Sequence, residues 1–134
     1  MHQQMPMDLE GMLRMLAGMP REERQFRQTE MLDMFFSMPE DRAAMMMRPV
    51  IEAKLKLSEA RQLALGETQT AVLADYPAHK RAFLLRAHKR ASEGLPEVAR
   101  MRDMQLTQAA AKRLDPERQQ RIMQAMQDVM GSRA

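Results

Sequence analysis

The sequence contains no cysteine, and this absence removes several classes of site at once. Without cysteine there is no disulfide framework, no thiolate metal ligand and no cysteine nucleophile. The histidines are also few: His2, His79 and His88. Because His79 and His88 are nine residues apart, a helix would place them about 180° apart, and they could not share a metal ion. We therefore expect no metal site in this chain.

Glycine is scarce as well, and its five copies stand apart from one another. The chain therefore has no glycine-rich loop for phosphate groups. Its four serines lie mostly at expected helix ends, where capping is the usual role. Carboxylates alternate with arginines at i to i+4 spacing, as they do on solvated helix faces. We expect a protein that is not an enzyme, with no catalytic residues and no cofactor.

Long apolar runs are also missing. No stretch approaches the roughly 18 residues that a membrane-spanning helix needs. The first residues, Met1 to Gln4, lack the cationic region and the apolar run of a secretory signal. These absences predict a cytoplasmic protein with no membrane partner.

What the sequence does contain is methionine. Leu, Ile, Val and Phe together supply only 24 of the 134 residues, a share at which disorder has to be considered. The 17 methionines bring the apolar content to 45%, and the net charge is only +3, so the composition is that of a folded protein. No segment alternates with a period of two, and aromatic residues make up 4%, so we expect no strand.

A pattern of an apolar residue, a helix-starting residue and then charges recurs every 19 residues. Its clearest copy is Met38-Pro39-Glu40-Asp41-Arg42. The other copies begin at Met19, Leu57, Tyr76, Leu95 and Leu114. A period near 20 is typical of a chain built from copies of one supersecondary unit.

This 19-residue period predicts the architecture. Five of the seven prolines follow it, and proline is favoured in the first turn of a helix. Helices of about 14 residues joined by short turns are expected to run antiparallel to their sequence neighbours. We therefore predict a loose N-terminal tail over residues 1–7 and a single all-α domain over residues 8–134, with about six short helices in a small helical solenoid or curved helical bundle. The alternative is an irregular bundle in which the period is accidental.

The helix boundaries between residues 49 and 74 are the hardest to place. Pro49 removes one intrahelical hydrogen bond and predicts a kink or a restart there. We expect one helix over residues 49–65 that stops at Gly66, followed by a short helix over residues 68–74.

Methionines occur in pairs three residues apart, a spacing that is typical of a buried helical stripe. Thioether sulfurs at this spacing also suit Cu(I), which leaves a methionine-based metal-handling protein as a distant alternative. Three methionines are consecutive: Met45, Met46 and Met47. At about 100° per residue they sweep some 200° of a helix, so at least one must point away from the core. We predict that they form an adaptable apolar surface for a partner helix or peptide.

Charge is unevenly distributed along the chain. Residues 76–113 carry a net charge of +6, whereas residues 1–75 carry −3. The helix expected from Pro77 collects four basic residues on one side, away from its apolar residues: His79, Arg86, Lys89 and Arg90. Such a basic face suits phosphates or an acidic protein surface, and a merely solvated face is the alternative.

These features together predict an interaction module, that is, an adaptor or regulatory protein that binds a protein partner. The contacts are expected from the methionine surface (Met45, Met46 and Met47) and from the basic face (His79, Arg86, Lys89 and Arg90). The alternative is a nucleic-acid-binding or regulatory protein that uses the basic surface of residues 76–113. Assembly into a homo-oligomer stays open.

Replacing Arg86, Lys89 and Arg90 together by alanine tests the basic face. Because exposed substitutions change stability by less than about 0.5 kcal/mol, the triple variant is expected to fold. It should bind an anionic partner more weakly, with the largest loss at low salt, in titrations at two salt concentrations. A steep salt dependence of binding to random duplex DNA would favour the nucleic-acid alternative. Unfolding of the variant would show that these side chains serve as structure.

Overall fold

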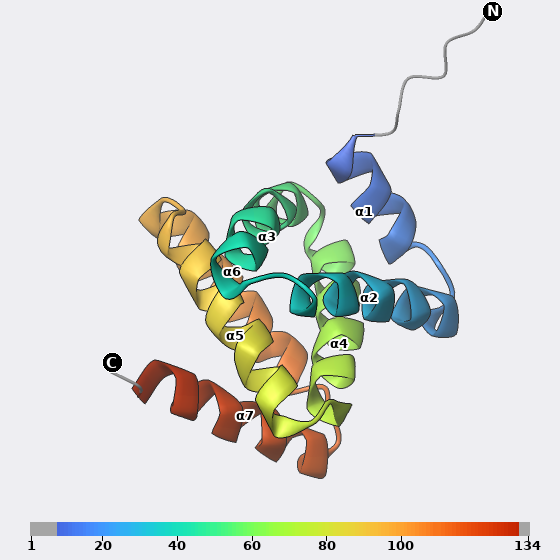
Figure 1. Cartoon of the computed structure of the whole chain (residues 1–134). Coiled ribbons are helices and arrows are strands. Elements are labelled where there is room, and N and C mark those ends of the chain that lie inside the picture. The colour runs from blue at the N-terminus through green and yellow to red at the C-terminus, as the bar shows by residue number, and fades with distance from the viewer. Residues whose placement is uncertain (1–7, 132–134) are drawn as a thin grey trace, which may run out of the picture.

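The computed structural model describes residues 8–131, and over this range the chain forms seven helices and no strand. They are α1 (Leu9–Ala17), α2 (Arg21–Phe36), α3 (Glu40–Leu55), α4 (Glu59–Asp75), α5 (Ala78–Glu93), α6 (Glu97–Ala111) and α7 (Pro116–Gly131) (Figure 1). The predicted all-α fold is confirmed, with one helix more than the six expected. The helices pack as a compact bundle. The tail expected over residues 1–7 lies outside the described residues, as do residues 132–134.

Residues with a strong preference for helix starts precede the helices. The carboxylate of Asp8 accepts a hydrogen bond from the Gly11 amide at 2.7 Å, and the hydroxyl of Ser58 accepts one from the Arg61 amide at 3.3 Å. Four prolines are the residues directly before a helix, with φ between −54° and −57°: Pro20, Pro39, Pro77 and Pro96. Only Pro116 lies within the first turn, as all five were expected to. From α2 to α7 the helices begin 19 residues apart.

Equal spacing along the chain does not produce equal packing. The main packing partners are helices two apart in the sequence: α3 on α5, α4 on α6, α2 on α4 and α5 on α7. In Figure 1, α2 lies across the view while α4 runs down it. The expected antiparallel hairpins between sequence neighbours are therefore wrong. Connections of only two to four residues, with extended backbone before most helices, turn the chain sharply instead of reversing it.

The boundaries expected between residues 49 and 74 are also wrong. Helix α3 continues past Pro49 to Leu55, and α4 is one helix from Glu59 to Asp75. Gly66 does not end a helix, because it lies buried within α4. A Cβ atom at Gly66 would come within 3.1 Å of the Ala110 Cβ atom of α6. A side chain at this position would therefore crowd the contact between α4 and α6.

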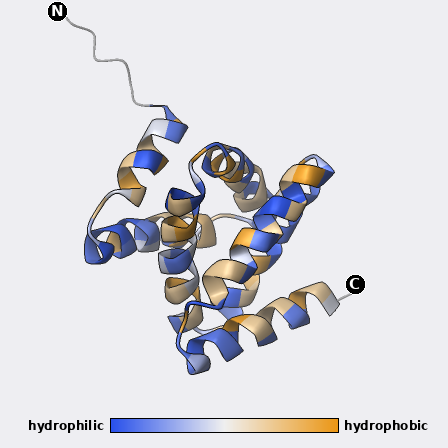
Figure 2. Cartoon of the chain, turned by 180° about the vertical axis from the view of Figure 1, so that it is seen from behind, coloured by the Kyte–Doolittle hydropathy of each residue, from blue (hydrophilic) through white to orange (hydrophobic). Residues whose placement is uncertain are grey.

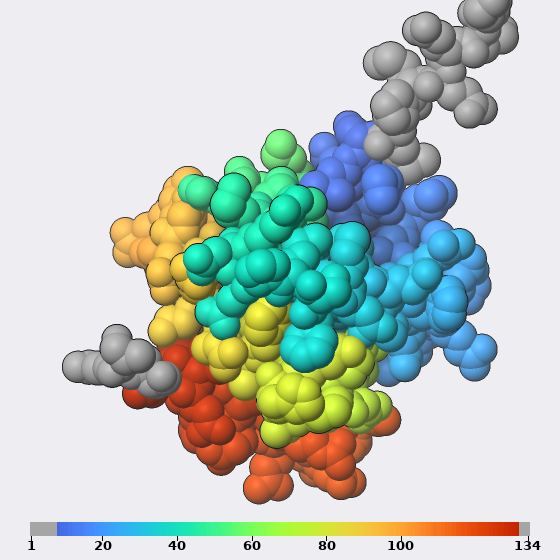
Figure 3. Space-filling model, in the orientation of Figure 1, coloured from blue at the N-terminus to red at the C-terminus, as the bar shows by residue number. Residues whose placement is uncertain are grey.

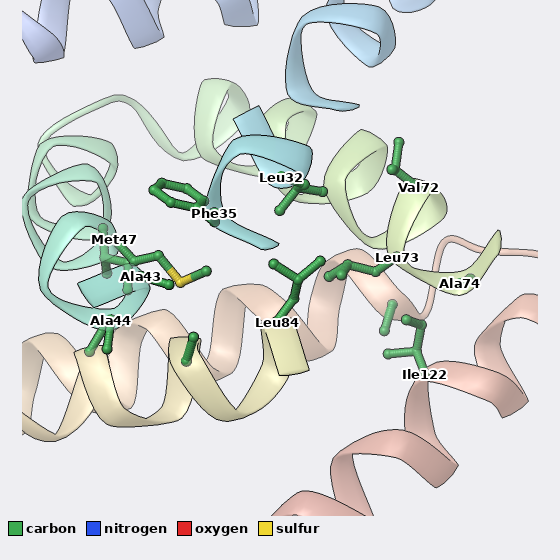
Figure 4. Close-up of a cluster of buried hydrophobic side chains, with 14 of the residues drawn as sticks. Leu32, Phe35, Ala43, Ala44, Met47, Val72, Leu73, Ala74, Leu84 and Ile122 are labelled. Carbon is green, nitrogen blue, oxygen red and sulfur yellow. The ribbon is translucent and has the colours of Figure 1, made fainter. Parts of the chain in front are cut away.

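The main core lies where α2 to α7 meet. Figure 4 shows Leu32 and Phe35 of α2, Met47 of α3, Leu84 of α5 and Ile122 of α7 pointing into this shared interior. A second, smaller cluster attaches α1 to α3 and α4. Figure 2 shows apolar and polar residues interspersed along the helices. Most of the large hydrophobic residues that are exposed are methionines.

Three connections are held by the same hydrogen-bond arrangement. The donors are Arg24, Gln62 and Arg81, and each is the fourth residue of its helix. Each donates to one backbone carbonyl at the end of the preceding helix, where carbonyls lack intrahelical partners, and to one carbonyl in the connection that follows it. The acceptors lie seven and five residues before each donor, at 2.6 to 3.3 Å: Ala17 and Met19, Leu55 and Leu57, and Ala74 and Tyr76. We call these contacts the joint clamps.

Substitution of a joint clamp tests its contribution. Arg81→Met keeps most of the aliphatic stem but loses both hydrogen bonds to the end of α4. Because hydrogen bonds from charged donors contribute about 1.5–3 kcal/mol, we expect the free energy of unfolding to fall by an amount in this range. Chemical denaturation measures it. Arg102→Met is the control, because Arg102 is exposed and has no ion pair within residues 8–131. If the two variants had equal free energies of unfolding, the Arg81 hydrogen bonds would not contribute the expected stability.

Candidate functional site

A groove of about 220 Å³ opens between α5, α6 and α7. Its apolar walls come from all three helices: Leu85, Met104, Met126, Val129 and Met130. Met104 and Met130 keep 43% and 59% of their surface exposed, so the groove has solvent-facing apolar walls. We call it the α5/α6/α7 groove. Concave apolar sites with a few polar groups are the usual form of a binding site.

The floor of the groove holds a buried polar cluster from three helices. His88 of α5 and Asp103 of α6 line the groove, and the His88 Nε2 atom lies 3.1 Å from the Asp103 Oδ2 atom. The other carboxylate oxygen, Oδ1, lies 3.8 Å from the Lys54 Nζ atom of α3. The side chains of Lys54 and Asp103 are only 11% and 2% exposed. We call these three residues the Lys54/Asp103/His88 cluster.

Burial and charge act against each other in this cluster. Burial disfavours the charged form of Asp103, but His88 and Lys54 outweigh it and hold the pKa of Asp103 below its usual value. Burial lowers the pKa of Lys54, and the charge of Asp103 offsets part of that effect. Asp103 Oδ1 has no hydrogen-bond partner among residues 8–131. The carboxylate is therefore held by its contacts with His88 and Lys54.

The cluster separates the groove from an interior cavity. This cavity has a volume of about 70 Å³ and lies among α2, α3, α4, α5, α6 and α7. Lys54 lines the cavity, Asp103 lines the groove, and Leu85, His88 and Thr107 line both. The wall between surface groove and interior is therefore partly polar, although most of the residues around the two spaces are apolar.

Two cations and one acid stand at the rim of the groove. Lys89 of α5 is half-buried and Arg100 of α6 is exposed. Neither forms an ion pair with another residue in the described part of the chain. The rim also carries Glu93, an exposed acid at the end of α5. The rim therefore offers two cationic groups for an outside partner.

The rest of the predicted basic face lies against α3. The Arg86 Nε atom is 2.8 Å from the Glu40 Oε1 atom, and the Arg90 Nη1 atom is 3.3 Å from Glu40 Oε2. Arg90 also pairs with Asp41. Lys89 is thus the only one of the three cations of this face that has no ion pair among residues 8–131 and reaches the groove. His79 is exposed in the first turn of α5, and its ring centroid lies 6.0 Å from that of Phe36.

The three consecutive methionines divide between surface and core. Met45 and Met46 are 75% and 45% exposed, whereas Met47 is 5% exposed and belongs to the main core. Met47 therefore does not contribute to the surface that was predicted for all three. In Figure 3, α3 forms the front of the molecule and packs beside α5. Met45 lies one turn after Asp41 on α3, so it shares a side of that helix with the acid that pairs with Arg90.

Sequence reasoning missed most of the groove. Met104 and Met126 were visible as members of pairs spaced by three, a pattern that indicated a buried stripe, and Met130 belonged to no such pair. The Lys54/Asp103/His88 cluster gave no local signal, because its members lie on three helices and 15 or more residues apart. Arg100 was counted only as part of the basic segment of residues 76–113.

Similarity to known proteins does not assign a role to the groove. No protein-family model matches this chain, and no significant match was found among curated proteins or solved structures. Within residues 8–131, no three His, Cys, Asp or Glu side chains are grouped as metal ligands. In the same range, every helix is too short or too polar to cross a bilayer.

Asp103→Asn tests the buried cluster. It leaves Lys54 buried without an anion, and removing one partner of a buried ion pair costs about 3–5 kcal/mol of stability. Chemical denaturation at neutral pH measures the loss. The stabilisation by Asp103 is present above the pKa of an unfolded aspartate, about 3.9, and is lost as the pH falls through its lower folded-state pKa. The difference from wild type should therefore narrow below about pH 4.

Two further variants control this measurement. Lys54→Met combined with Asp103→Leu removes both charges, and apolar replacement of a buried pair is often close to neutral, so the double variant should lose less than Asp103→Asn. Asp128→Asn changes an exposed aspartate of α7 and should have little effect. A double variant as unstable as Asp103→Asn would show that hydrogen bonding or packing, and not charge pairing, is what the cluster contributes.

Proposed function

We propose that this protein is a non-enzymatic interaction module that binds a segment of a partner protein in the α5/α6/α7 groove. The observation that carries the proposal is a concave surface with exposed methionine walls. Methionine is unbranched and polarisable, so such walls adapt to different apolar side chains. Exposed apolar surface of this kind is typical of protein interaction sites.

The hydroxyl groups beside the polar cluster support a non-enzymatic role. The Ser92 Oγ atom donates to the His88 carbonyl at 3.1 Å, and the Thr107 Oγ1 atom donates to the Asp103 carbonyl at 2.9 Å. Both hydroxyls are thus bound to the backbone one turn earlier in their own helices. A nucleophile would instead face a base such as His88. We therefore assign His88 and Asp103 to the framework of the groove.

The ion pairs of α5 give the nucleic-acid alternative less support. Arg86 and Arg90 face Glu40 and Asp41, and the Lys80 Nζ atom lies 2.6 Å from the Asp33 Oδ1 atom. Acids of α2 and α3 therefore offset part of the basic surface that phosphates would need. The exposed Met45 and Met46 form a second candidate surface for a protein partner. A cytoplasmic location stays a prediction.

Glutamate substitutions in the groove test the proposed function. Met130→Glu places a carboxylate in the apolar wall of α7, where partner binding would have to bury it. We expect at least about a tenfold loss of affinity. Immobilised wild-type and variant proteins are compared for the partner that they retain from a lysate of the native cell, and the identified partner is then titrated.

The same helix supplies a matched control. Met123 is 52% exposed, close to the 59% of Met130, but it does not line the groove. Met123→Glu should leave partner binding unchanged. If Met123→Glu abolished binding and Met130→Glu did not, the partner would bind elsewhere and the groove would not be the site.

A further inference from the structure

The groove presents three helical stripes to its occupant. Helix α5 contributes residues 85, 88, 89, 92 and 93, α6 contributes residues 100, 103, 104 and 107, and α7 contributes residues 126, 129 and 130. From first to last residue, the α5 stripe advances by eight residues and the α6 stripe by seven, which at 1.5 Å per residue is about 10–12 Å, or about two helical turns. An occupant that follows the groove therefore meets its walls over about two turns.

The described structure favours a helix as the occupant. Residues 8–131 contain no strand, so this part of the chain has no sheet edge to which a peptide could add a strand. An amphipathic helix binds an apolar groove through side chains at positions i, i+3, i+4 and i+7, which covers two turns. The length of the groove matches this set of contacts. The adaptable side chains of Met104 and Met130 suit its apolar face.

The rim determines the charge of that helix. Arg100 lies four residues after Pro96, the same position that Arg81 has after Pro77. Arg81 binds the end of the preceding helix, but Arg100 has no hydrogen bond of that kind among the described residues. Instead it stands at the rim with Lys89, which also has no ion pair there. Both cations are available to carboxylates of an occupant.

We propose that the α5/α6/α7 groove binds an acidic amphipathic helix of the partner protein, an inference that rests on the proposed function. The apolar face of this helix lies on the methionine walls, and its acidic residues lie against Lys89 and Arg100. Glu93 on the same rim repels acids on its side. The acidic residues of the partner are therefore expected towards the two cations and away from Glu93, which gives the bound helix one orientation.

Two synthetic helical peptides test the charge preference. They share one leucine-rich apolar face, and their polar faces carry either glutamate or lysine. Fluorescence anisotropy with the full-length protein at low salt should show the glutamate peptide binding at least about tenfold more tightly than the lysine peptide. High salt should reduce this ratio, because exposed charges are screened beyond about 10 Å at 0.1 M ionic strength.

Charge reversal locates the interaction. Lys89→Glu combined with Arg100→Glu should remove or reverse the preference for the glutamate peptide. Arg102→Glu combined with Lys112→Glu is the control, because it changes the net charge equally at exposed residues of α6 and its C-terminal end that do not line the groove. Circular dichroism confirms that each variant keeps its helices. Equal effects of the two double variants would overturn a specific role for the rim.

The remaining outcomes separate this inference from the proposed function. If both peptides bind equally and Met130→Glu weakens both, the groove binds helices but the acidic preference is overturned. If the glutamate peptide binds and Met130→Glu has no effect, binding lies elsewhere, and both the inference and the groove as the site of the proposed function fail. If neither peptide binds, the inference is overturned, whereas the proposed function is judged on the natural partner.

Discussion

The packing of this bundle depends on how each short connection is turned, and the joint clamps hold three of the six connections between the described helices. Arg24, Gln62 and Arg81 bind carbonyls that the end of a helix leaves without partners, and so they fix the direction in which the next helix departs. Because the chain turns at each clamp instead of reversing, each helix packs on the one after next. That arrangement places α5 between α3 and α7. One side of α5 therefore faces the acids of α3, and another side lines the groove.

The connection between α5 and α6 is held differently, by an arginine from another helix. Arg48 of α3 donates to the carbonyl of Gly94 in this connection. A Cβ atom at Gly94 would come so close to the guanidinium group of Arg48 that this group would have to move. The residue in the clamp position of α6, Arg100, is exposed at the rim of the groove and has no clamp hydrogen bond among the described residues. The arginine at this position is therefore left as a cation of the rim.

Local features of the fold were predictable from the sequence, and non-local ones were not. The prolines mark helix starts because their φ angle and missing amide favour that position in any surroundings. Gly66 looked like a helix end, but its close neighbour Ala110 is 44 residues away in the sequence. The helical pattern placed Arg86, Lys89 and Arg90 on one side of α5, but in the structure Arg86 and Arg90 pair with acids of α3 and Lys89 lines the groove. Those acids, Glu40 and Asp41, come from a helix about 46 residues earlier, and no helical pattern contains that contact.

The buried cluster beside the groove has a consequence for binding. Buried ion pairs add little to stability compared with apolar packing, but their hydrogen bonds and charges tolerate few alternative arrangements. The Lys54/Asp103/His88 cluster joins α3, α5 and α6 at the groove and therefore fixes the α5 and α6 walls relative to each other. The methionines that line those walls can still change rotamer. A rigid frame with an adaptable lining lets the apolar face of a partner vary, whereas the positions of Lys89 and Arg100 decide where its charges must lie.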